Sequence, residues 1–369
     1  MEKPKLAVII GRFQPLHNGH LPLFKTALDL VGGNGKVVVL LGSANQPRTP
    51  YNPFTWEERA DIIEKWIMNE LKPNSYWVGY YPLNDYKYND GDWIEEVQRI
   101  VDSVNKDNKY ETFLVGHHKD NSSYYLDIFP QWKDVVEVPA FDESLSATII
   151  REAYFEIQYG DLIQVKFKNK VQVSSEPVCI NIIEDRVPKS TFKFLNEFAN
   201  RPGETLNNLV NEFLYYEEYP SQWGNGPFVT VDAAVFCCGH ILLIRRKTIP
   251  GQGLYALPGG FLNNDEFIAT GIVRELEEET RIKVPTPALH GNMKHIELFD
   301  HPKRSLRGRV ITHCGLINLR NDKKLPEVRG ADDADKAVWV PTSEFTDKFR
   351  EKMFEDHYDM VIRMKSLLK

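Results

Sequence analysis

The stretch LAVIIGRFQPLHNGH, residues 6–20, decides the fold of the first half of the chain. Residues 6–10 are an all-apolar run of strand length, and residues 11–20 form a loop that contains two glycines and two histidines. Apolar side chains at helical spacing follow in residues 21–31. Because a buried strand that leads through a loop into an amphipathic helix begins a βαβ unit, the stretch predicts a parallel α/β sheet.

The loop itself has the features of an anion site. Gly11 and Gly19 allow the backbone to approach a ligand, and the helix start offers N–H groups at the positive end of its dipole. His17 and His20 are three residues apart, so they share one side of the first turn and can donate to phosphate oxygens. A metal-binding pair and two packed core histidines are the alternative interpretations.

The rest of residues 1–150 continues the alternation of strands and helices. A capping box, Thr55-x-x-Glu58, predicts one helix, and Asp92-x-x-Glu95 predicts the start of another. Further buried strands are expected at residues 37–41, 76–80, 112–115 and 135–138. Apolar strands between amphipathic helices indicate a parallel sheet covered on both faces, and such sheets bind ligands beyond the carboxyl ends of their strands.

A second polar element follows the last of these strands. Ser146 is a plausible helix N-cap, and Thr148 adds a hydroxyl in the first turn. Arg151 can hold a phosphate through two hydrogen bonds. Alone, this pattern is typical of an ordinary helix start, but together with the histidine loop it predicts a second side to the phosphate site.

These two elements resemble the signatures of a known family. Residues 11–20 match GxFxPxHxGH, and residues 146–151 are similar to SxTxxR, the signatures of nucleotidyltransferases related to class I aminoacyl-tRNA synthetases. Gly42-Ser-Ala and Asn52-Pro-Phe-Thr-x-x-Glu-Arg59 resemble the archaeal-type NMN adenylyltransferases in particular. The resemblance covers about residues 5–155.

The resemblance implies a Rossmann-like domain over residues 1–200 that converts NMN and ATP to NAD and pyrophosphate, with Mg²⁺ on the ATP phosphates. It implies catalytic roles for His17, His20 and Arg151. It implies substrate-binding roles for Gly11, Arg12, Phe13, Gly19, Ser146 and Thr148.

Two more residues match this family in their spacing. Asp85 and Trp93 correspond to the acidic residue and the tryptophan that it places around the nicotinamide of NMN. A stacked tryptophan suits a cationic pyridinium ring, whereas a core position on an amphipathic helix is the alternative for Trp93. Residues 156–186 match no family that we can name, although strands are expected at 171–173 and 178–183.

From residue 228 the pattern changes to that of an α+β domain over residues 228–369. Residues 201–227, rich in Tyr, Pro and Gly in their second half, are expected to form a connector. The elements expected after it are a hairpin of residues 229–236 and 241–244, strands at 310–317 and 337–340, and a closing helix at 353–368.

One helix of this domain, expected over about residues 266–280, carries an acidic face. Glu275, Glu278 and Glu279 lie three and four residues apart, so their carboxylates share that face and repel one another. Because hard oxygen ligands suit Mg²⁺ or Mn²⁺, the pattern predicts a divalent metal site. A solvated acidic helix face is the alternative.

The same stretch resembles the Nudix box, G-x5-E-x7-REUxEExGU with U aliphatic. Every specified position matches except the glycine, which is replaced by Arg281. The resemblance implies that Glu275, Glu278 and Glu279 bind the metal and that water is activated against a diphosphate linked to a nucleoside. Arg274 can tie the helix to the loop that carries Glu266. A left-handed conformation is expected at Arg281, just past the helix end.

Flanking residues resemble the ADP-ribose pyrophosphatases, which implies hydrolysis of ADP-ribose to AMP and ribose 5-phosphate. They include Asp232, the pair Arg245–Arg246 and the loop 250–260. Arg304 and Arg307, together with Arg309, can be phosphate clamps, or they can be ordinary surface charge.

Composition limits the class of protein. Lys and Arg number 45 and Asp and Glu 52, and this net charge of −7 argues against a general nucleic-acid binder. No stretch approaches the ~18 apolar residues of a membrane span, and the N-terminus lacks signal-peptide anatomy, so a cytoplasmic protein is expected. The cysteines have no metal-ligand spacing and are expected to be buried free thiols: Cys179, Cys237, Cys238 and Cys314.

The resulting hypothesis is a bifunctional enzyme whose partners are NMN, ATP and ADP-ribose, with neither nucleic acid nor membrane. A homodimer is possible, but the sequence leaves the oligomeric state open. One rival is a regulator that senses NAD-related ligands through a degenerate Nudix domain, although residues after 340 leave little room for a helix-turn-helix. Another rival keeps the enzyme class but changes the substrate, to another nucleoside diphosphate derivative, an RNA cap or another adenylyl acceptor.

Overall fold

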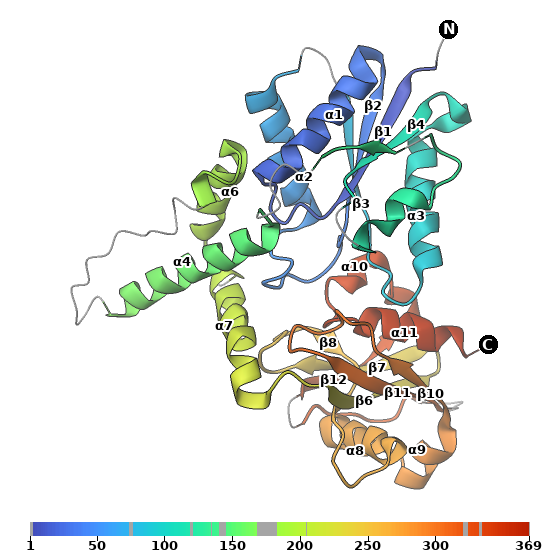
Figure 1. Cartoon of the computed structure of the whole chain (residues 1–369). Coiled ribbons are helices and arrows are strands. Elements are labelled where there is room, and N and C mark those ends of the chain that lie inside the picture. Colours follow the sequence, from blue (N-terminus) through green and yellow to red (C-terminus); the bar gives the residue numbers. More distant parts are fainter. Residues whose placement is uncertain are drawn as a thin grey trace. The chain divides into compact units, whose positions relative to one another are not determined.

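The computed structural model describes residues 3–73, 77–118, 121–133, 135–139, 145–167, 183–203, 205–319, 324–331 and 334–368. It divides into two compact units (Figure 1). The first unit holds Met1–Asp85 and Asn89–Val210, and the second holds Tyr86–Tyr88 and Asn211–Lys369. The strand expected at 171–173 and most of that at 178–183 lie outside the described residues.

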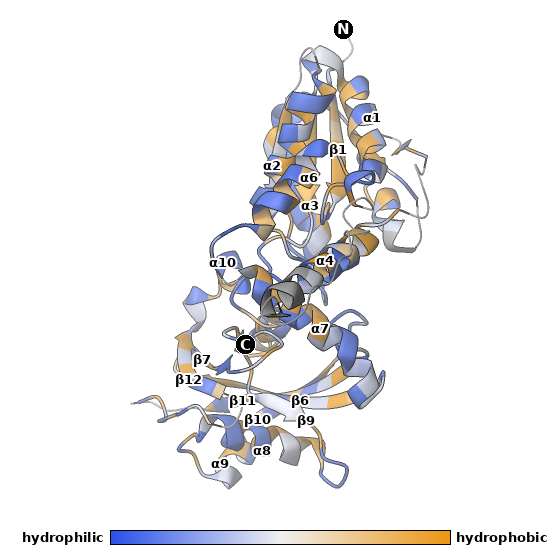
Figure 2. Ribbon diagram, turned by 90° about the vertical axis from the view of Figure 1, so that its left-hand side faces the viewer, coloured by the Kyte–Doolittle hydropathy of each residue, from blue (hydrophilic) through white to orange (hydrophobic). Residues whose placement is uncertain are grey.

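The first unit is built on a five-stranded parallel sheet of order β3-β2-β1-β4-β5. Its strands are β1 (Lys5–Gly11), β2 (Lys36–Leu41), β3 (Val78–Pro82), β4 (Glu111–Gly116) and β5 (Val136–Glu137). In the central strand β1, Val8 lies opposite Val38 on one side and Leu114 on the other. This strand is hydrophobic along most of its length because helices cover both its faces (Figure 2). The predicted parallel sheet is therefore confirmed, although Tyr76 lies outside the described residues.

Helices cover this sheet on two sides. They are α1 (Leu21–Val31), α2 (Trp56–Trp66) and α3 (Asp90–Val104), while α6 (Lys189–Ala199) packs on α2 and α4 (Ala147–Phe167) extends away from the sheet (Figure 1). Helix α3 packs Val97 and Val101 against the face that carries Leu6. Helices α1 and α2 pack on the strands from the other face and meet through Phe24 and Trp66, whose rings lie 5.9 Å apart.

Side-chain caps set where two of these helices begin. The Thr55 hydroxyl accepts from the Glu58 N–H while the Glu58 side chain accepts from the Thr55 N–H, which confirms the predicted capping box. Helix α3 begins two residues earlier than predicted. Asn89 is its cap, and the Asn89 side chain accepts from the Asp92 N–H, so Asp92 belongs to the first turn.

The second unit is built on a seven-stranded mixed sheet with the main order β10-β11-β6-β7-β12. Its strands are β6 (Phe228–Cys237), β7 (His240–Arg246), β8 (Tyr255–Ala256), β9 (Gly259–Phe261), β10 (Met293–Phe299), β11 (Val310–Leu319) and β12 (Ala334–Pro341). Strands β6 and β11 are parallel, and the other pairs are antiparallel. Phe236 lies opposite Ile241, which confirms the predicted hairpin.

Alternation along β6 sends its side chains to two separate cores. Val231 and Val235 pack with Leu276 of helix α8 (Ile268–Thr280), near helix α9 (Thr286–Asn292). Phe236 packs on the other face, with Met360 of helix α11 (His357–Ser366) and with helix α10 (Asp347–Arg350). Asp232 therefore faces α11, because it is an even number of residues from Phe236.

The closing helix is shorter than the predicted 353–368. Residues before α11 instead form backbone hydrogen bonds with strand β8. Tyr255 N–H donates to Lys352 O, and Phe354 N–H donates to Tyr255 O. This pairing replaces the helical hydrogen bonds that the apolar periodicity suggested.

The expected connector contains a 19-residue helix, α7 (Thr205–Trp223), and the boundary between the two units falls within it. Composition misled the prediction here, since Tyr and Pro residues occur inside the helix. None of the helices in the described part of the chain has the length and apolar composition of a membrane span. Cys237 and Cys314 are buried as predicted, whereas Cys238 is exposed because it occupies the hairpin turn. Cys179 lies outside the described residues.

Candidate active sites

The loop between β1 and α1 holds the two predicted histidines against each other. The rings of His17 and His20 stack with centroids 3.6 Å apart. Gly19 N–H donates to His17 Nδ1 at 3.1 Å, and His17 N–H donates to His20 Nδ1 at 3.2 Å. Because each Nδ1 accepts, the neutral form of each ring carries its proton on Nε2, which makes Nε2–H the donor.

The predicted glycines and Phe13 shape this loop. A Cβ on Gly19 would lie 3.0 Å from His17 Cε1, so a larger residue would push the His17 ring away. A Cβ on Gly11 would lie 2.5 Å from Phe13 Cζ. The Phe13 ring in turn meets the His20 ring edge-on at 4.9 Å. These close approaches fix the positions of both imidazoles.

Arg151 reaches the same loop from α4. Its guanidinium donates to Gln14 O at 2.6 Å and to the Thr148 hydroxyl at 3.1 Å. The guanidiniums of Arg12 and Arg151 lie 4.0 and 5.1 Å from the centre of the Tyr51 ring. Burial, and then the charge of Arg12, lowers the pKa of Arg151 to about 10. The two signature elements therefore meet, with two cations close together.

Two smaller observations concern the predicted anion site. Arg12 Nε is buried and has no hydrogen-bond partner among the described residues. Ile149 N–H donates to the Ser146 hydroxyl at 3.4 Å, as expected for a cap at the start of α4. An anion would supply the acceptor that Arg12 Nε lacks.

Arg59 is a residue of this site to which sequence reasoning gave no role. It is 1% exposed, and it donates to Arg12 O at 2.6 Å and to Gly42 O at 2.7 Å, so it joins the ends of β1 and β2. Burial, and then Arg12, lowers its pKa to about 9. The sequence did contain a sign that Arg59 is buried, because it lies at helical spacing from the apolar residues Ile62 and Trp66 and so shares their face of α2.

Asp85 and Trp93 lie in different surroundings. Asp85 Oδ1 accepts from Ser43 N–H at 3.2 Å, beside the end of β2. Trp93 is partly buried, and its ring contacts those of Tyr125 and Phe129 at 6.1 and 6.4 Å. Their roles toward nicotinamide stay predictions.

In the second unit, Arg274 binds the acidic residues of α8 together. Its guanidinium donates to Glu266 at 2.6 and 3.0 Å, which confirms the predicted tie between helix and loop. It also donates to Glu275 at 2.8 Å and to Glu278 at 2.9 Å. These bonds hold two of the three predicted metal ligands in place.

Strand β9 lies directly against the other side of these carboxylates. Glu279 is 5% exposed and accepts from Gly259 N–H at 2.8 Å. A Cβ on Gly260 would lie 2.6 Å from Glu275 Oε1. Burial raises the pKa of Glu279 to about 8 and also raises that of Glu275. Three crowded carboxylates, two of them with pKa values raised by burial, fit a hard divalent cation.

Arg281 ends α8 in the left-handed conformation, with φ 45° and ψ 34°. Its N–H donates to Glu277 O at 3.0 Å. The expected left-handed position at the missing Nudix glycine is therefore confirmed.

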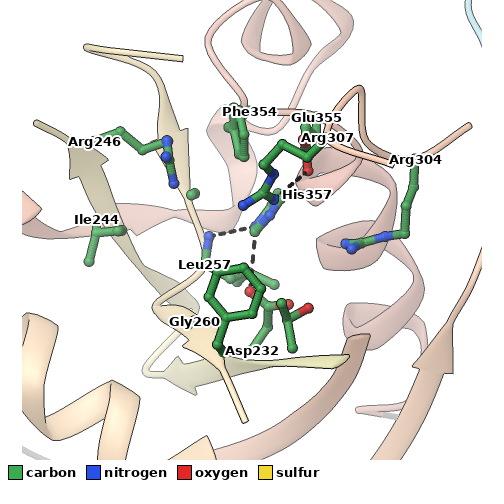
Figure 3. Close-up of a pocket in the computed structure, with 14 residues that line it drawn as sticks. Asp232, Ile244, Arg246, Leu257, Gly260, Arg304, Arg307, Phe354, Glu355 and His357 are labelled. Carbon is green, nitrogen blue, oxygen red and sulfur yellow. Dashed lines mark hydrogen bonds and ion pairs between the residues drawn. The ribbon is translucent and has the colours of Figure 1, made fainter. Parts of the chain in front are cut away.

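A pocket of about 440 Å³, part of it open to solvent, adjoins β9 (Figure 3). Its lining residues are Thr230, Asp232, Ile244, Arg246, Ala256, Leu257, Gly259, Gly260, Phe261, Arg304, Arg307, Phe354, Glu355 and His357. Arg246 lies over the Phe354 ring at 4.2 Å and donates through Nε to Pro250 O at 2.8 Å. The lining thus combines an aromatic ring with several cations.

The predicted arginines differ in their partners. Arg304 is 3% exposed and donates to both carboxylate oxygens of Asp356, at 2.9 and 3.0 Å. Arg307 lines the pocket with Glu355 3.5 Å away. Arg309 pairs with Asp300 at 3.2 Å.

A buried polar pair lies within the pocket and was missed as a pair. Asp232 accepts from the Thr312 hydroxyl at 2.5 Å, and burial raises its pKa to about 6. His357 Nδ1 lies 4.0 Å from Asp232 Oδ1 and accepts from Leu257 N–H at 3.0 Å. Burial lowers the pKa of His357 to about 3, so this ring is neutral. The signal for Asp232 was a single charge in an otherwise apolar strand.

Comparisons with known proteins agree with this division. The family model described as Cytidylyltransferase-like matches residues 8–153, and the NUDIX domain model matches residues 226–364. Nicotinamide/nicotinic acid mononucleotide adenylyltransferase of Acinetobacter baylyi is 35% identical over 200 residues, which are 54% of this chain and 89% of the relative. ADP-ribose pyrophosphatase of Methanocaldococcus jannaschii is 34% identical over 111 residues, 30% of this chain and 60% of the relative.

One solved structure matches almost the whole chain. It is a bifunctional NMN adenylyltransferase/ADP ribose pyrophosphatase from Francisella tularensis, complexed with AMP and a manganese ion. Its identity to this chain is 33%, its TM-score is 0.80, and the match covers 98% of this chain and 99% of that one. This chain belongs to the family of bifunctional NMN adenylyltransferases/ADP-ribose pyrophosphatases.

Proposed function

We propose that this chain makes NAD with residues 1–200 and hydrolyses ADP-ribose with residues 228–369, joined by residues 201–227. The observation that supports the proposal is that each half has its own complete set of groups. In the first half, one loop carries His17 and His20, and Arg151 donates to its backbone. In the second half, the α8 carboxylates adjoin a separate pocket. The relatives named above carry these two activities in their names.

In the first reaction, an oxygen of the NMN phosphate attacks the α-phosphorus of ATP. The bond from that phosphorus to the bridging oxygen breaks, and pyrophosphate leaves with NAD as the other product. No protein nucleophile takes part, so positioning and neutralisation of charge provide the catalysis. The Nε2–H groups of His17 and His20, Arg12 Nε and Arg151 donate to phosphate oxygens, within a loop shaped by Gly11, Phe13 and Gly19 and a helix start held by Ser146 and Thr148.

Asp85 and Trp93 would both contact the nicotinamide of NMN, as the resemblance implies. The negative face of the Trp93 ring attracts the cationic pyridinium. The Asp85 carboxylate can attract the charge of the pyridinium or accept a hydrogen bond from the nicotinamide amide group. Mg²⁺ carried by the ATP phosphates would supply further neutralisation of their charge.

In the second reaction, a water oxygen attacks one phosphorus of ADP-ribose and the P–O–P bridge breaks, giving AMP and ribose 5-phosphate with release of the water proton. Glu275, Glu278 and Glu279 would hold Mg²⁺ or Mn²⁺, which would supply Lewis-acid activation of water and positive charge toward the diphosphate. Arg274 positions two of these carboxylates. Arg307 and Arg246, in the pocket lining, bind diphosphate oxygens, while Arg304 supports the site through Asp356.

The test uses the full chain with Mg²⁺, supplied either with NMN and ATP or with a panel of nucleoside diphosphate derivatives. We expect NAD formation and preferential hydrolysis of ADP-ribose. Glu278→Gln should abolish hydrolysis and spare NAD formation, because it removes a metal ligand of one site only. NAD formation without hydrolysis of any compound in the panel would instead support the ligand-sensor hypothesis for the second unit.

A further inference from the structure

Helix α7 supplies a buried carboxylate that binds a loop beside the hydrolase pocket. Glu212, 9% exposed, accepts from Gly251 N–H through Oε1 at 2.6 Å. Both residues belong to the second unit, although Glu212 precedes the region that the NUDIX model matches. A buried carboxylate that accepts a backbone N–H from another element fixes the position of that backbone.

The loop that Glu212 binds carries pocket residues at its edge. Gly251 packs so closely on Phe354 that a Cβ there would overlap the ring. On the other side, Arg246 Nε donates to Pro250 O at 2.8 Å, and Gly253 N–H donates to Arg246 O at 2.9 Å. Arg246 and Phe354 both line the pocket. The loop therefore connects Glu212 to two residues of the pocket lining.

Aromatic residues of α7 form a second connection to the pocket. The Tyr219 ring lies 5.5 Å from that of Tyr215 and 5.6 Å from that of Phe228, and Phe228 lies 6.1 Å from Phe261, which lines the pocket. Glu212, Tyr215 and Tyr219 are spaced three and four residues apart, so they share one face of α7. That face is directed toward the hydrolase fold.

Charges around Glu212 favour the same arrangement. Burial raises the pKa of Glu212, while the Gly251 hydrogen bond and the charge of Arg246 lower it. Burial also raises the pKa of the neighbouring Tyr216. The charge of Glu212 raises that pKa further, while the charges of Arg307 and Arg246 lower it. The charge of Arg246 thus adds a weaker attraction to the hydrogen bond from Gly251 N–H, which is the direct contact.

We propose that Glu212 is a positioning residue of the ADP-ribose pyrophosphatase site. It holds Gly251, and through the 246–254 loop it places Arg246 and Phe354 where the nucleoside diphosphate binds. The second half of α7 is thus a working part of the hydrolase and not only a connector. This inference rests on the hydrolase activity proposed above.

The experiment compares two substitutions that separate reach from charge. Glu212→Asp keeps the charge but withdraws the acceptor by one carbon–carbon bond, and Glu212→Gln keeps the acceptor in place without the charge. We expect Glu212→Asp to raise the KM for ADP-ribose and the Kd for AMP about 10-fold, as for loss of one hydrogen bond to a charged group. Glu212→Gln should stay within about threefold of the wild type.

Glu217→Asp, at an exposed position of the same helix, is the matched control and should leave both constants unchanged. NAD synthesis and the metal concentration for half-maximal hydrolysis should not change in any variant. A merely structural role would lower the melting temperature of Glu212→Asp and leave its KM and AMP Kd at wild-type values, which would overturn the inference. Absence of hydrolysis by the wild-type chain would instead contradict the proposed function.

Discussion

His17 and His20 stack their imidazoles 3.6 Å apart, and each presents Nδ1 to a backbone N–H of its own loop. Nδ1 of each ring therefore builds the loop, and the opposite nitrogen, Nε2, is left for the proposed contact with phosphate. The structural role and the proposed catalytic role thus fall on different atoms of the same side chain. A substitution can remove one role and keep the other.

His20→Asn should separate the two roles. The asparagine carbonyl can replace Nδ1 as the acceptor for His17 N–H, but it provides no donor at the position of Nε2. We expect NAD synthesis to fall about 10²-fold or more, as for removal of one transition-state donor. Initial rates of both reactions measure the effect. ADP-ribose hydrolysis should be unchanged, and an equal loss of both activities would contradict two separate sites.

Trp93→Ala should raise the KM for NMN much more than that for ATP. Stacking of an aromatic side chain on a base contributes about 1–3 kcal/mol, so a rise of at least about fivefold is expected. Steady-state kinetics with each substrate varied in turn provide the measurement. If the variant melts much earlier while both KM values stay at wild-type values, Trp93 is a core residue that packs on Tyr125 and Phe129.

Gly260→Ala should disturb the metal site from the strand side. The added Cβ would lie 2.6 Å from Glu275 Oε1, so the carboxylate must move. We expect a higher Mg²⁺ concentration for half-maximal hydrolysis and unchanged NAD synthesis. Gly291→Ala is the control, because a Cβ there meets no heavy atom within 4 Å. Identical Mg²⁺ dependence of both variants would argue against Glu275 as a ligand.

Arg281→Gly should stabilise the protein slightly and leave hydrolysis within a few-fold. A non-glycine residue at φ 45° costs roughly 1 kcal/mol. Relief of that cost should raise the melting temperature by about 2–4 °C. Thermal unfolding and initial rates test both statements. Hydrolysis that appears only after Arg281→Gly would favour the ligand-sensor hypothesis.

His357 should make the second unit less stable as the pH falls below about 6.5. Its folded-state pKa is about 3, against 6.5 for an unperturbed imidazole, so the unfolded chain binds the proton first. The contribution of neutral His357 to the free energy of unfolding is fully present above pH 6.5. It decreases by up to about 1.4 kcal/mol per pH unit as the pH falls toward 3. Asp232, whose folded pKa of about 6 lies above its usual 3.8, acts in the opposite direction between those values.

His357→Asn isolates the histidine contribution, because the asparagine carbonyl can still accept from Leu257 N–H while Asp232 remains. Lowering the pH from 7 to 5 should shift the melting temperature of this variant upward relative to that of the wild type, because the histidine contribution that opposes Asp232 and Glu279 is gone. An equal shift in both proteins would mean that other groups cause the loss of stability.

The sequence predicted elements best where the physical signal is local. The first-unit strands at 6–10, 37–41 and 112–115 agree with β1, β2 and β4 to within one residue at each end, because each is a mainly apolar run between a charged residue and a glycine. The helix in the connector was missed because composition outweighed periodicity. Spacing along the chain also identified two separate groups of neighbouring side chains. One is the set of carboxylates on α8, and the other is the pair of histidines in the loop after β1.

The remaining site residues depend on contacts that no spacing encodes. His357 accepts a hydrogen bond from Leu257 N–H, which lies 100 residues away in the sequence. Arg304 donates to Asp356, which lies 52 residues away. Arg246 was named from the resemblance to ADP-ribose pyrophosphatases, but the pairing of β7 with β12 and the contact with Phe354, which the sequence does not show, set its position in the pocket. Such long-range partners become visible only when the sheet is assembled.

The hydrogen bond from Gly251 to Glu212 also bears on how this chain can be cut. A fragment that starts at residue 226 would contain the whole matched NUDIX region but would lack the carboxylate that holds the 246–254 loop. Protein engineers who isolate, swap or fuse the hydrolase should therefore cut the chain before residue 205, so that α7 stays with it. For modular design, the functional border of the hydrolase lies on the N-terminal side of the border that sequence similarity suggests.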